Sequence, residues 1–370
     1  MSEAVAAFLP ATQRWFRTAL GAPTPPQALG WPAIQRGEHT LILSPTGSGK
    51  TLAAFLWGID RIYRDLAADP SLCGVKLLDI SPLMALNNDI ARNLREPLAG
   101  IRAAAEALGA PLPPLRIAVR TGDTPSSERQ RMVRQPPHIL ITTPESLYLI
   151  LTSPKARDIL PTVQCVIVDE IHTLCGEKRG VHLALSLERL GALIGRPFQR
   201  IGLSATQRPL EEVARFLGGS AWRPASDGGE ELVERPVTIV DAGARKALDV
   251  RIITAVPDLR HMVGDSIWLS VVPDVLNTVR RHHTTLIFVN GRRAAERAAD
   301  RLNEQYALKE AEVVPPGSPA ALLRDGVPVG QGLFGTGRVD GPFRAHHGSV
   351  SRDVRLELET KLKAGALPAL

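Results

Sequence analysis

The chain has 370 residues, of which 44% are hydrophobic and 22% charged, a composition that excludes general disorder and suits two compact domains. It contains no apolar stretch long enough to span a membrane and no basic start of a secretory signal, so we expect a cytoplasmic enzyme without a membrane partner. Its three cysteines are too few for a disulfide framework, and 44 Lys and Arg against 38 Asp and Glu favour a polyanionic partner over a merely soluble basic protein.

Short apolar runs bounded by Gly, Pro and Asp predict the strands of the first part of the chain. They lie at residues 40–43, 75–80, 116–119, 139–142, 163–168 and 200–203. Longer helix-like segments, such as residues 83–108 and 181–194, separate them. This alternation predicts an α/β fold with a parallel sheet that helices cover on both faces.

Residues 226–234 break the apolar periodicity with glycine and acidic residues, so we predict a first domain over 1–225 and a linker over 226–236. The second domain is then expected over 237–370. Its predicted elements are strands at 237–240, 250–254 and 285–289, a helix at 292–303 and a flexible Gly/Pro-rich loop at 314–342.

Residues 44–51 read Ser-Pro-Thr-Gly-Ser-Gly-Lys-Thr between a predicted strand and a predicted helix, which is the context of a phosphate-binding loop. Small residues let main-chain amides close around phosphate oxygens, and the helix N-terminus favours the same anion. The residues concerned are Ser44, Thr46, Gly47, Ser48 and Gly49. We expect Lys50 to hold the β- and γ-phosphates and Thr51 to place its hydroxyl on Mg²⁺. Ser44 departs from the general pattern, which begins with glycine.

A nucleotide with Mg²⁺ also needs a carboxylate at the end of a nearby strand, and Asp169 and Glu170 follow an apolar run. Asp169 is expected to hold the metal through water, and Glu170 to polarise the attacking water. The interval from Lys50 to Asp169 is too long for one strand–helix–strand step. This excludes a compact nucleotide kinase.

The segment from Asp169 to His172 (Asp-Glu-Ile-His) resembles the DExH box of superfamily 2 helicases, and Ser204, Ala205 and Thr206 match the family's Ser-Ala-Thr motif. The resemblance implies that His172 belongs to the catalytic group and that the Ser-Ala-Thr motif couples the ATP state to nucleic-acid grip. It also places Gln27 where the family reads adenine. Phe16 fits either packing on the base or the protein core.

Three further segments resemble the family's motifs for gripping a nucleic-acid backbone. They supply Ser81 and Pro82, then Thr121 and Gly122, then Thr142, Thr143 and Pro144. Hydroxyls and main-chain amides suit phosphate contacts that do not depend on base sequence. Thr143 before Pro144 is equally suited to start a helix as its N-cap, and both roles are compatible.

The second region continues the resemblance through Asn290 and through His347 and Gly348, which we expect to bind nucleic acid. The segments PTGSGKTLAAFL, SPLMALNNDI, TTPESLYLIL, VDEIHTL and HHGSVSRDVR are similar to those of the Lhr (large helicase-related) family. Membership implies a complete RecA-like domain followed by an incomplete second one. It also implies ATP-driven 3′ to 5′ movement on single-stranded DNA, unwinding of duplexes or RNA–DNA hybrids, and a place near DNA repair.

The family's later Q-x-x-G-R-x-G-R pattern, whose arginine reaches the γ-phosphate, does not occur after Arg344. We therefore expect an amino-terminal fragment. A nucleotide- and nucleic-acid-binding unit without effective turnover remains the alternative to a working motor. A transporter ATPase would need an LSGGQ-like signature, which the sequence lacks.

Overall fold

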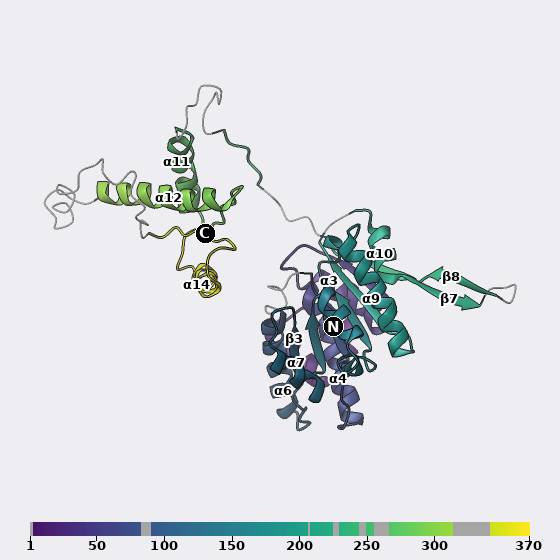
Figure 1. Ribbon diagram of the computed structural model, residues 1–370. Coiled ribbons are helices and arrows are strands. Elements are labelled where there is room, and N and C mark those ends of the chain that lie inside the picture. The colour runs from purple at the N-terminus through teal and green to yellow at the C-terminus, as the bar shows by residue number, and fades with distance from the viewer. Residues whose placement is uncertain are drawn as a thin grey trace. The chain divides into compact units, whose positions relative to one another are not determined.

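The computed structural model describes residues 3–82, 90–205, 208–224, 229–243, 249–254, 266–313 and 341–370. The chain divides into two compact units, Met1–Ala247 and Leu248–Leu370 (Figure 1). None of the described helices is long and apolar enough to cross a bilayer.

A seven-stranded parallel sheet in the order β3-β4-β2-β5-β6-β1-β9 forms the centre of the first unit. Its strands are β1 (His39–Leu43), β2 (Leu77–Ile80), β3 (Ile117–Arg120), β4 (Ile139–Thr142), β5 (Cys165–Val168), β6 (Gln199–Ser204) and β9 (Val237–Asp241). All six strands expected in the first domain form, within one or two residues of their expected bounds. The α/β prediction is confirmed.

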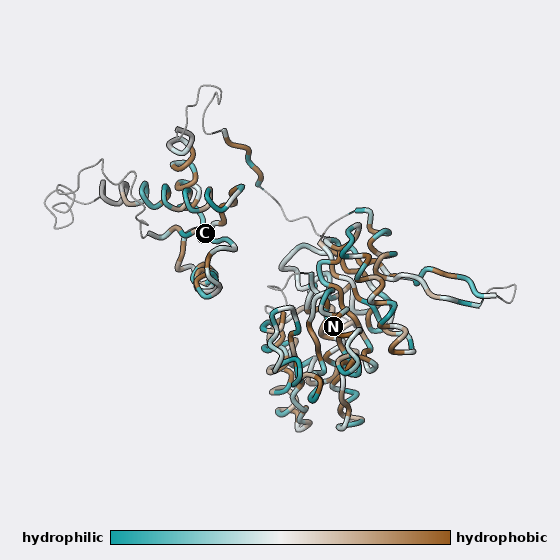
Figure 2. The backbone as a smooth tube through the Cα atoms, viewed as in Figure 1, coloured by the Kyte–Doolittle hydropathy of each residue, from teal (hydrophilic) through white to brown (hydrophobic). Residues whose placement is uncertain are grey.

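Helices cover both faces of this sheet (Figure 2). Its central strands are therefore mostly apolar, although β2 contains Asp79. One face packs against α1 (Glu3–Ala6), α2 (Pro10–Ala19), α3 (Pro25–Gln35), α4 (Lys50–Ala68) and α6 (Arg95–Glu106). The other packs against α8 (Pro144–Thr152), the 3₁₀ turns η1 (Arg157–Ile159) and η2 (Ile171–Thr173), α9 (Lys178–Ile194) and α10 (Leu210–Gly218). Beyond β3 the chain forms α7 (Ser126–Arg134). The helix expected over 83–108 is observed in part, because residues 83–89 lie outside the described chain.

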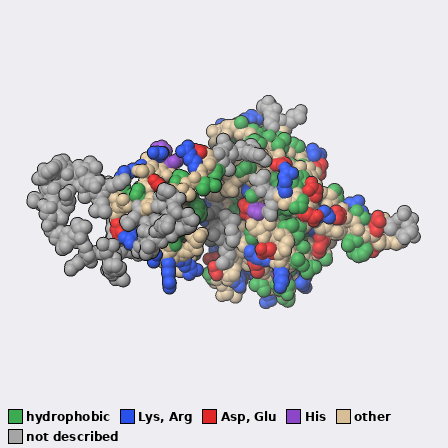
Figure 3. Space-filling view, turned by 90° about the horizontal axis from the view of Figure 1, so that it is seen from above, with side chains coloured by type: hydrophobic (Ala, Val, Ile, Leu, Met, Phe, Trp, Pro, Cys, Tyr) green, Lys and Arg blue, Asp and Glu red, His purple; other side chains and the backbone are tan. Residues whose placement is uncertain are grey.

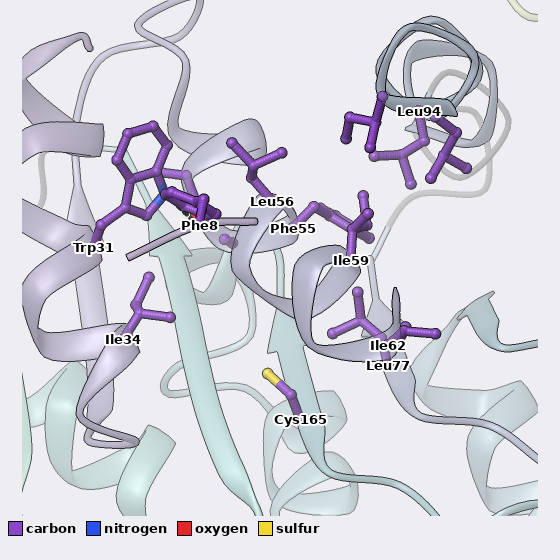
Figure 4. Packing of buried hydrophobic residues seen from close by; sticks show 14 of the residues in the cluster. Phe8, Trp31, Ile34, Phe55, Leu56, Ile59, Ile62, Leu77, Leu94 and Cys165 are labelled. Carbon is purple, nitrogen blue, oxygen red and sulfur yellow. Dashed lines mark hydrogen bonds between the residues drawn. The ribbon is translucent and has the colours of Figure 1, made fainter. Parts of the chain in front are cut away.

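Aromatic side chains fix the N-terminal helices against α4 (Figure 4). The ring centroid of Trp31 lies 5.0 Å from that of Phe8 and 5.3 Å from that of Phe16, both edge to face. Phe16 is 1% exposed. It is therefore a core residue, and of the two roles left open for it the structure supports this one.

The expected domain boundary needs correction, because β9 completes the first sheet instead of opening a second one. Residues Val237–Asp241 pair in parallel with His39–Leu43, and Val240 is buried there. Within the segment expected to be a linker, residues 230–234 form β8 (Glu230–Glu234), which pairs with the preceding β7 (Ser220–Pro224) in an antiparallel hairpin that projects from the sheet in Figure 1. Residues 226–228 of the expected linker lie outside the described chain. After the hairpin the chain returns to pair with β1, so the first unit continues past residue 236.

The second unit contains α11 (Ser266–Arg280), α12 (Arg292–Val313) and α14 (Arg352–Lys363). The helix expected at 292–303 is confirmed, but the strand expected at 250–254 is not formed, and Ile252 is 95% exposed without a pairing partner. The strand expected at 285–289 is reduced to a short pairing: Thr285 and Phe343 each form a parallel bridge with Ala369. Residues 314–340 of the expected loop lie outside the described chain.

Candidate nucleotide site and nucleic-acid edge

The expected phosphate-binding loop joins the buried end of β1 to the N-terminus of α4, a helix of 19 residues. The hydroxyls of Ser44 and Ser48 are buried and have no hydrogen-bond partner in the described chain. Thr46 and Gly47 are exposed at the tip of the loop. Unpaired hydroxyls, exposed small residues and a helix N-terminus make a cradle that suits an anion.

Two glycines give the loop its course. Gly47 and Gly49 have φ angles of +78° and +87°, a left-handed conformation that other residues rarely adopt. A Cβ on Gly49 would also lie 2.9 Å from the side-chain Nε2 of Gln27. Gln27 is buried in α3, where its Oε1 accepts from the amide of Thr24 and its Nε2 donates to the carbonyl of Gly49 at 3.4 Å. The structure therefore brings Gln27 to the loop, as the sequence predicts.

Lys50 connects the loop to the segment after β5. Its Nζ lies 3.3 Å from Oε1 of Glu170, and the two side chains are 6% and 22% exposed. Glu170 adopts a left-handed conformation with φ of 46°, which is unfavourable for a residue with a side chain. Such strain persists only where the surroundings impose it, so the position of this carboxylate is closely defined.

Asp169 and Asp79 place two buried carboxyl groups beside the loop. Burial, followed by the charge of Glu170, raises the pKa of Asp169 to about 6. Asp79, in β2, is fully buried, and neither of its oxygens has a hydrogen-bond partner in the described chain. Burial and the nearby Asp169 raise the pKa of Asp79 well above its usual range. Burial and the neighbouring carboxylates therefore outweigh the charge of Lys50 at Asp169, and this donor set fits a divalent cation that arrives with a phosphate ligand.

His172 links the Asp-Glu-Ile-His segment to the end of β6. Its Nδ1 lies 3.5 Å from Oε2 of Glu170 and 3.2 Å from Oγ of Ser204, and it accepts from the amide of Ala205 at 3.4 Å. Ser204 is fully buried. Four of the expected residues thus form one connected group, while Thr206 lies outside the described chain.

The residues expected to grip nucleic acid gather at the carboxyl ends of β2, β3 and β4. The amide of Ser81 donates to the carbonyl of Thr142, and the buried Ser81 hydroxyl has no partner in the described chain. Thr121 is buried, whereas Gly122 is exposed. The hydroxyl of Thr142 is fully buried and donates to the carbonyl of Arg120. Any ligand contact by Thr142 must therefore come from its main chain.

Thr143 starts α8, as the capping interpretation predicts. Its hydroxyl accepts from the amide of Ser146, and Pro144 occupies the first turn. Because the Thr143 hydroxyl caps the helix, only main-chain groups of this helix start remain for an anion.

Arg179 was not identified from the sequence, although it joins two of these segments. From α9 its Nη2 donates to the carbonyl of Pro82 at 2.8 Å, and its guanidinium pairs with the carboxylate of Glu145 in α8. Both interactions span long intervals of sequence, so no local pattern reveals them.

The remaining predicted residues belong to the second unit. Asn290 and His347 line one cavity of about 400 Å³, whose walls come from α12 and from the segments around Phe288 and Phe343. His347 accepts from the amide of Ser349 through Nδ1 and lies 2.8 Å from Oε1 of Glu296 through Nε2. Gly348 is exposed beside it.

The chain is similar to a known family and to several known proteins. The family described as DEAD/DEAH box helicase matches residues 24–214, just over half of the chain. A protein of Mycolicibacterium smegmatis named Lhr helicase/probable uracil glycosylase is 48% identical over 97% of this chain. ATP-dependent helicase Lhr-Core protein 2 of Thermococcus barophilus is 45% identical over 96% of it.

A solved structure is also similar over nearly the whole chain. The structure of Mycobacterium smegmatis helicase Lhr bound to ssDNA and AMP-PNP has a TM-score of 0.77 and 44% identity, covering 99% of this chain and 41% of that one. The chain spans 23% of the length of the curated M. smegmatis relative and 37% of that of the T. barophilus relative. The matched region in each case contains the loop and the carboxylate segment described above.

Proposed function

Because the chain belongs to the DEAD/DEAH box helicase family and is homologous to its Lhr members, we propose that it provides the ATP-dependent motor region of an Lhr-type helicase. The observation that carries this proposal is the connected group at the carboxyl ends of the strands. Lys50 contacts Glu170, Glu170 lies beside His172, and His172 contacts Ser204 and Ala205. A change of ligand at the loop can therefore reach the Ser-Ala-Thr segment through direct contacts.

In this proposal ATP lies against the loop, with Gln27 beside the adenine and Lys50 on the β- and γ-phosphates. Mg²⁺ would be held by Thr51 and Asp169, where it would neutralise phosphate charge. Burial raises the pKa of Asp169 to about 6, and a bound cation would favour the ionised form of this carboxyl. Glu170 orients the attacking water and accepts its proton, which requires Lys50 to exchange its carboxylate partner for phosphate.

We propose single-stranded DNA as the nucleic-acid partner, running over the carboxyl ends of β2, β4 and β3. The relative of known structure is described as bound to ssDNA and AMP-PNP. The second unit is proposed to act as a partial second RecA-like domain that contributes Asn290, His347 and Gly348. Movement from 3′ to 5′, unwinding of RNA–DNA hybrids and a cytoplasmic role in DNA repair complete the proposal.

A second candidate is binding of nucleotide and nucleic acid with little turnover. The observation that favours it is the contact between Lys50 and Glu170, which occupies the carboxylate that is proposed to accept the proton of the attacking water. Steady-state phosphate release by the chain, with and without single-stranded DNA, separates the candidates, because a motor is stimulated by DNA and a binding unit is not.

The decisive test of the nucleotide site is calorimetric titration of Mg-ATP into the chain and its Lys50→Ala variant. We expect binding to be abolished in the variant, because the loop loses its only charged phosphate contact. Lys155→Ala, which removes an exposed lysine away from the loop, is the matched control and should bind like the parent. Unchanged affinity of Lys50→Ala would refute the site.

A further inference from the structure

Arg120 ends β3, the edge strand of the large sheet, and its side chain is in an unusual environment. The residue is 8% exposed, and its Nη1 is buried without a hydrogen-bond partner. Its guanidinium forms no ion pair with any residue of the described chain. Arginine stays protonated in proteins, so this buried charge cannot be relieved by losing a proton.

The charged group that acts on Arg120 is a second arginine. Arg129 projects from α7, and its Nη2 donates to the carbonyls of Thr121 and Gly122 at 3.4 and 2.7 Å. Its Nε is also buried and unpartnered. Burial, followed by the charge of Arg129, lowers the pKa of Arg120. Two guanidinium groups therefore approach each other without a described carboxylate between them.

This pair continues the row of residues expected to meet nucleic acid. In the order β3-β4-β2, Arg120 lies opposite Thr142 and Thr142 lies opposite Ile80, which precedes Ser81. Neighbouring strands are about 4.8 Å apart, so the row crosses the carboxyl edge of three strands. Among the described residues of this row, Arg120 at the outer end is the one with a buried, charged side chain.

We propose that Arg120 and Arg129 form a phosphate-binding site at the outer end of this row and hold one phosphodiester of a single-stranded nucleic acid. The inference rests on the proposed function and assigns it a charged anchor that the motif residues do not supply. A guanidinium presents parallel N–H donors that match two phosphate oxygens, and an anion supplies the missing counter-charge. Arg129 also holds the carbonyls of Thr121 and Gly122, which keeps the adjacent turn in place for the same phosphate.

If Arg120 had a structural role instead, its substitution would lower the stability of the fold. An arginine that stabilises the fold is paired, and its removal leaves a partner without a bond. Arg120 has no described side-chain partner, so its removal should relieve a buried charge. The proposal therefore expects Arg120→Met to weaken ligand binding while its melting temperature stays equal to or above that of the parent.

The test is fluorescence anisotropy of a labelled oligodeoxythymidylate titrated with the 370-residue chain at several salt concentrations. The slope of log affinity against log salt should become shallower by about 0.7 in Arg120→Met, because one phosphate contact of a single strand is lost. Affinity should fall about tenfold at low salt. Arg120→Lys keeps the charge and should keep the slope. Arg131→Met, from the exposed face of α7, is the matched control and should behave like the parent.

Melting temperatures with and without inorganic phosphate form the second arm. Phosphate should stabilise the parent and Arg131→Met more than Arg120→Met.

An unchanged salt slope in Arg120→Met, with normal binding by the parent, would overturn this inference and leave the proposed function intact. If the phosphate effect is lost while the slope is unchanged, the site takes a free anion and the backbone assignment is wrong. A lower melting temperature of Arg120→Met with an unchanged slope indicates a structural arginine. Failure of the parent to bind DNA would overturn both proposals.

Discussion

The strands of the large sheet begin along one side, the amino edge, and end along the opposite side, the carboxyl edge. The two differ in whether their buried polar groups are paired. At the amino edge, Arg200 is 2% exposed, and it donates to Glu188 and to the carbonyls of Leu217 and Gly218. Arg235 binds the same carboxylate with two nitrogens. At the carboxyl edge, side chains of Ser44, Asp79, Ser81 and Arg120 have buried atoms without partners in the described chain.

Within this one sheet, paired polar groups stabilise the fold, whereas unpaired polar groups lie where ligands are proposed to bind. Buried polar groups are normally paired, because an unpaired one costs free energy. At the amino edge, Arg200 and Arg235 follow that rule, because both pair with Glu188. The carboxyl edge departs from it at the positions where the proposed nucleotide and nucleic acid would bind, together with the strained backbone of Glu170. On the face seen in Figure 3, basic and acidic side chains are interspersed.

The largest effect on stability is expected from breaking the paired edge. Glu188→Gln leaves Arg200 and Arg235 without their carboxylate and should lower the free energy of unfolding by about 3 kcal/mol. The side chain of Glu188 is 42% exposed, which keeps the loss at the lower end for such pairs. Urea denaturation measures it. Glu212→Gln, which breaks the exposed pair with Arg215, is the control and should cost less than about 1 kcal/mol. Equal losses in the two variants would contradict the comparison.

Acid should also destabilise the amino edge. Burial, followed by the charge of Arg116, lowers the pKa of His138 to about 4, and its Nδ1 accepts from the amide of Arg116. The unfolded chain takes up this proton at a higher pH than the folded one, so stability is present above pH ~6.5 and is lost as the pH falls toward 4. His138→Gln should remove about 2 kcal/mol of that pH dependence. Unfolding free energies at pH 7 and pH 4.5 measure it, and an unchanged difference would count against this origin.

Asp79 at the carboxyl edge should respond in the opposite direction. Its raised pKa means that the folded chain holds a proton which the unfolded chain releases, so stability is greatest at low pH and falls as the pH rises through the range between the unfolded and folded pKa values. Asp79→Asn cannot ionise and should be more stable than the parent at pH 8 by about 1–2 kcal/mol. Thermal melts at pH 5 and pH 8 measure the two slopes. A loss of stability at pH 8 would show that the buried carboxylate has a partner.

The sequence predicts the parts of this site that are local in the chain. The loop of residues 44–51 and the carboxylates of Asp169 and Glu170 carry their own strand and helix contexts, so their positions follow from neighbouring residues. The cap at Thr143 is local for the same reason. Where a prediction was wrong, pairing over long distances decided the outcome: nothing near residues 237–241 indicates that they pair with β1.

Asp79, Arg120 and Arg179 were missed for a related reason. Their importance lies in the presence or absence of a partner, which only the folded chain determines. A signal for Asp79 exists in the sequence, because an acidic residue interrupts the apolar run Leu77–Ile80 in a strand expected to be buried on both faces. The second unit shows the same limit, since the apolar run at 285–289 forms only a short pairing with the segment around Ala369.

The smallest effect on stability is expected at Arg179, which combines features of both edges. It lies at the carboxyl edge, yet it is paired, with Glu145 and with the carbonyl of Pro82. Because its side chain is 36% exposed, Arg179→Ala should cost less than about 1 kcal/mol of stability. It should nevertheless weaken binding of single-stranded DNA about threefold. Arg179 joins the segments that contain Pro82 and Glu145, and contacts with DNA depend on the spacing of these segments. Unlike Arg120→Met, this variant should keep the salt slope of the parent, because Arg179 positions the segments without touching phosphate.

Two variants serve as controls. Glu145→Gln, which removes the charged partner of Arg179, should give the same pattern, and Arg215→Ala should give neither effect. A salt slope that becomes shallower in Arg179→Ala would place this guanidinium on the phosphate instead, and the distinction between a paired positioning arginine and an unpaired binding arginine at this edge would fail.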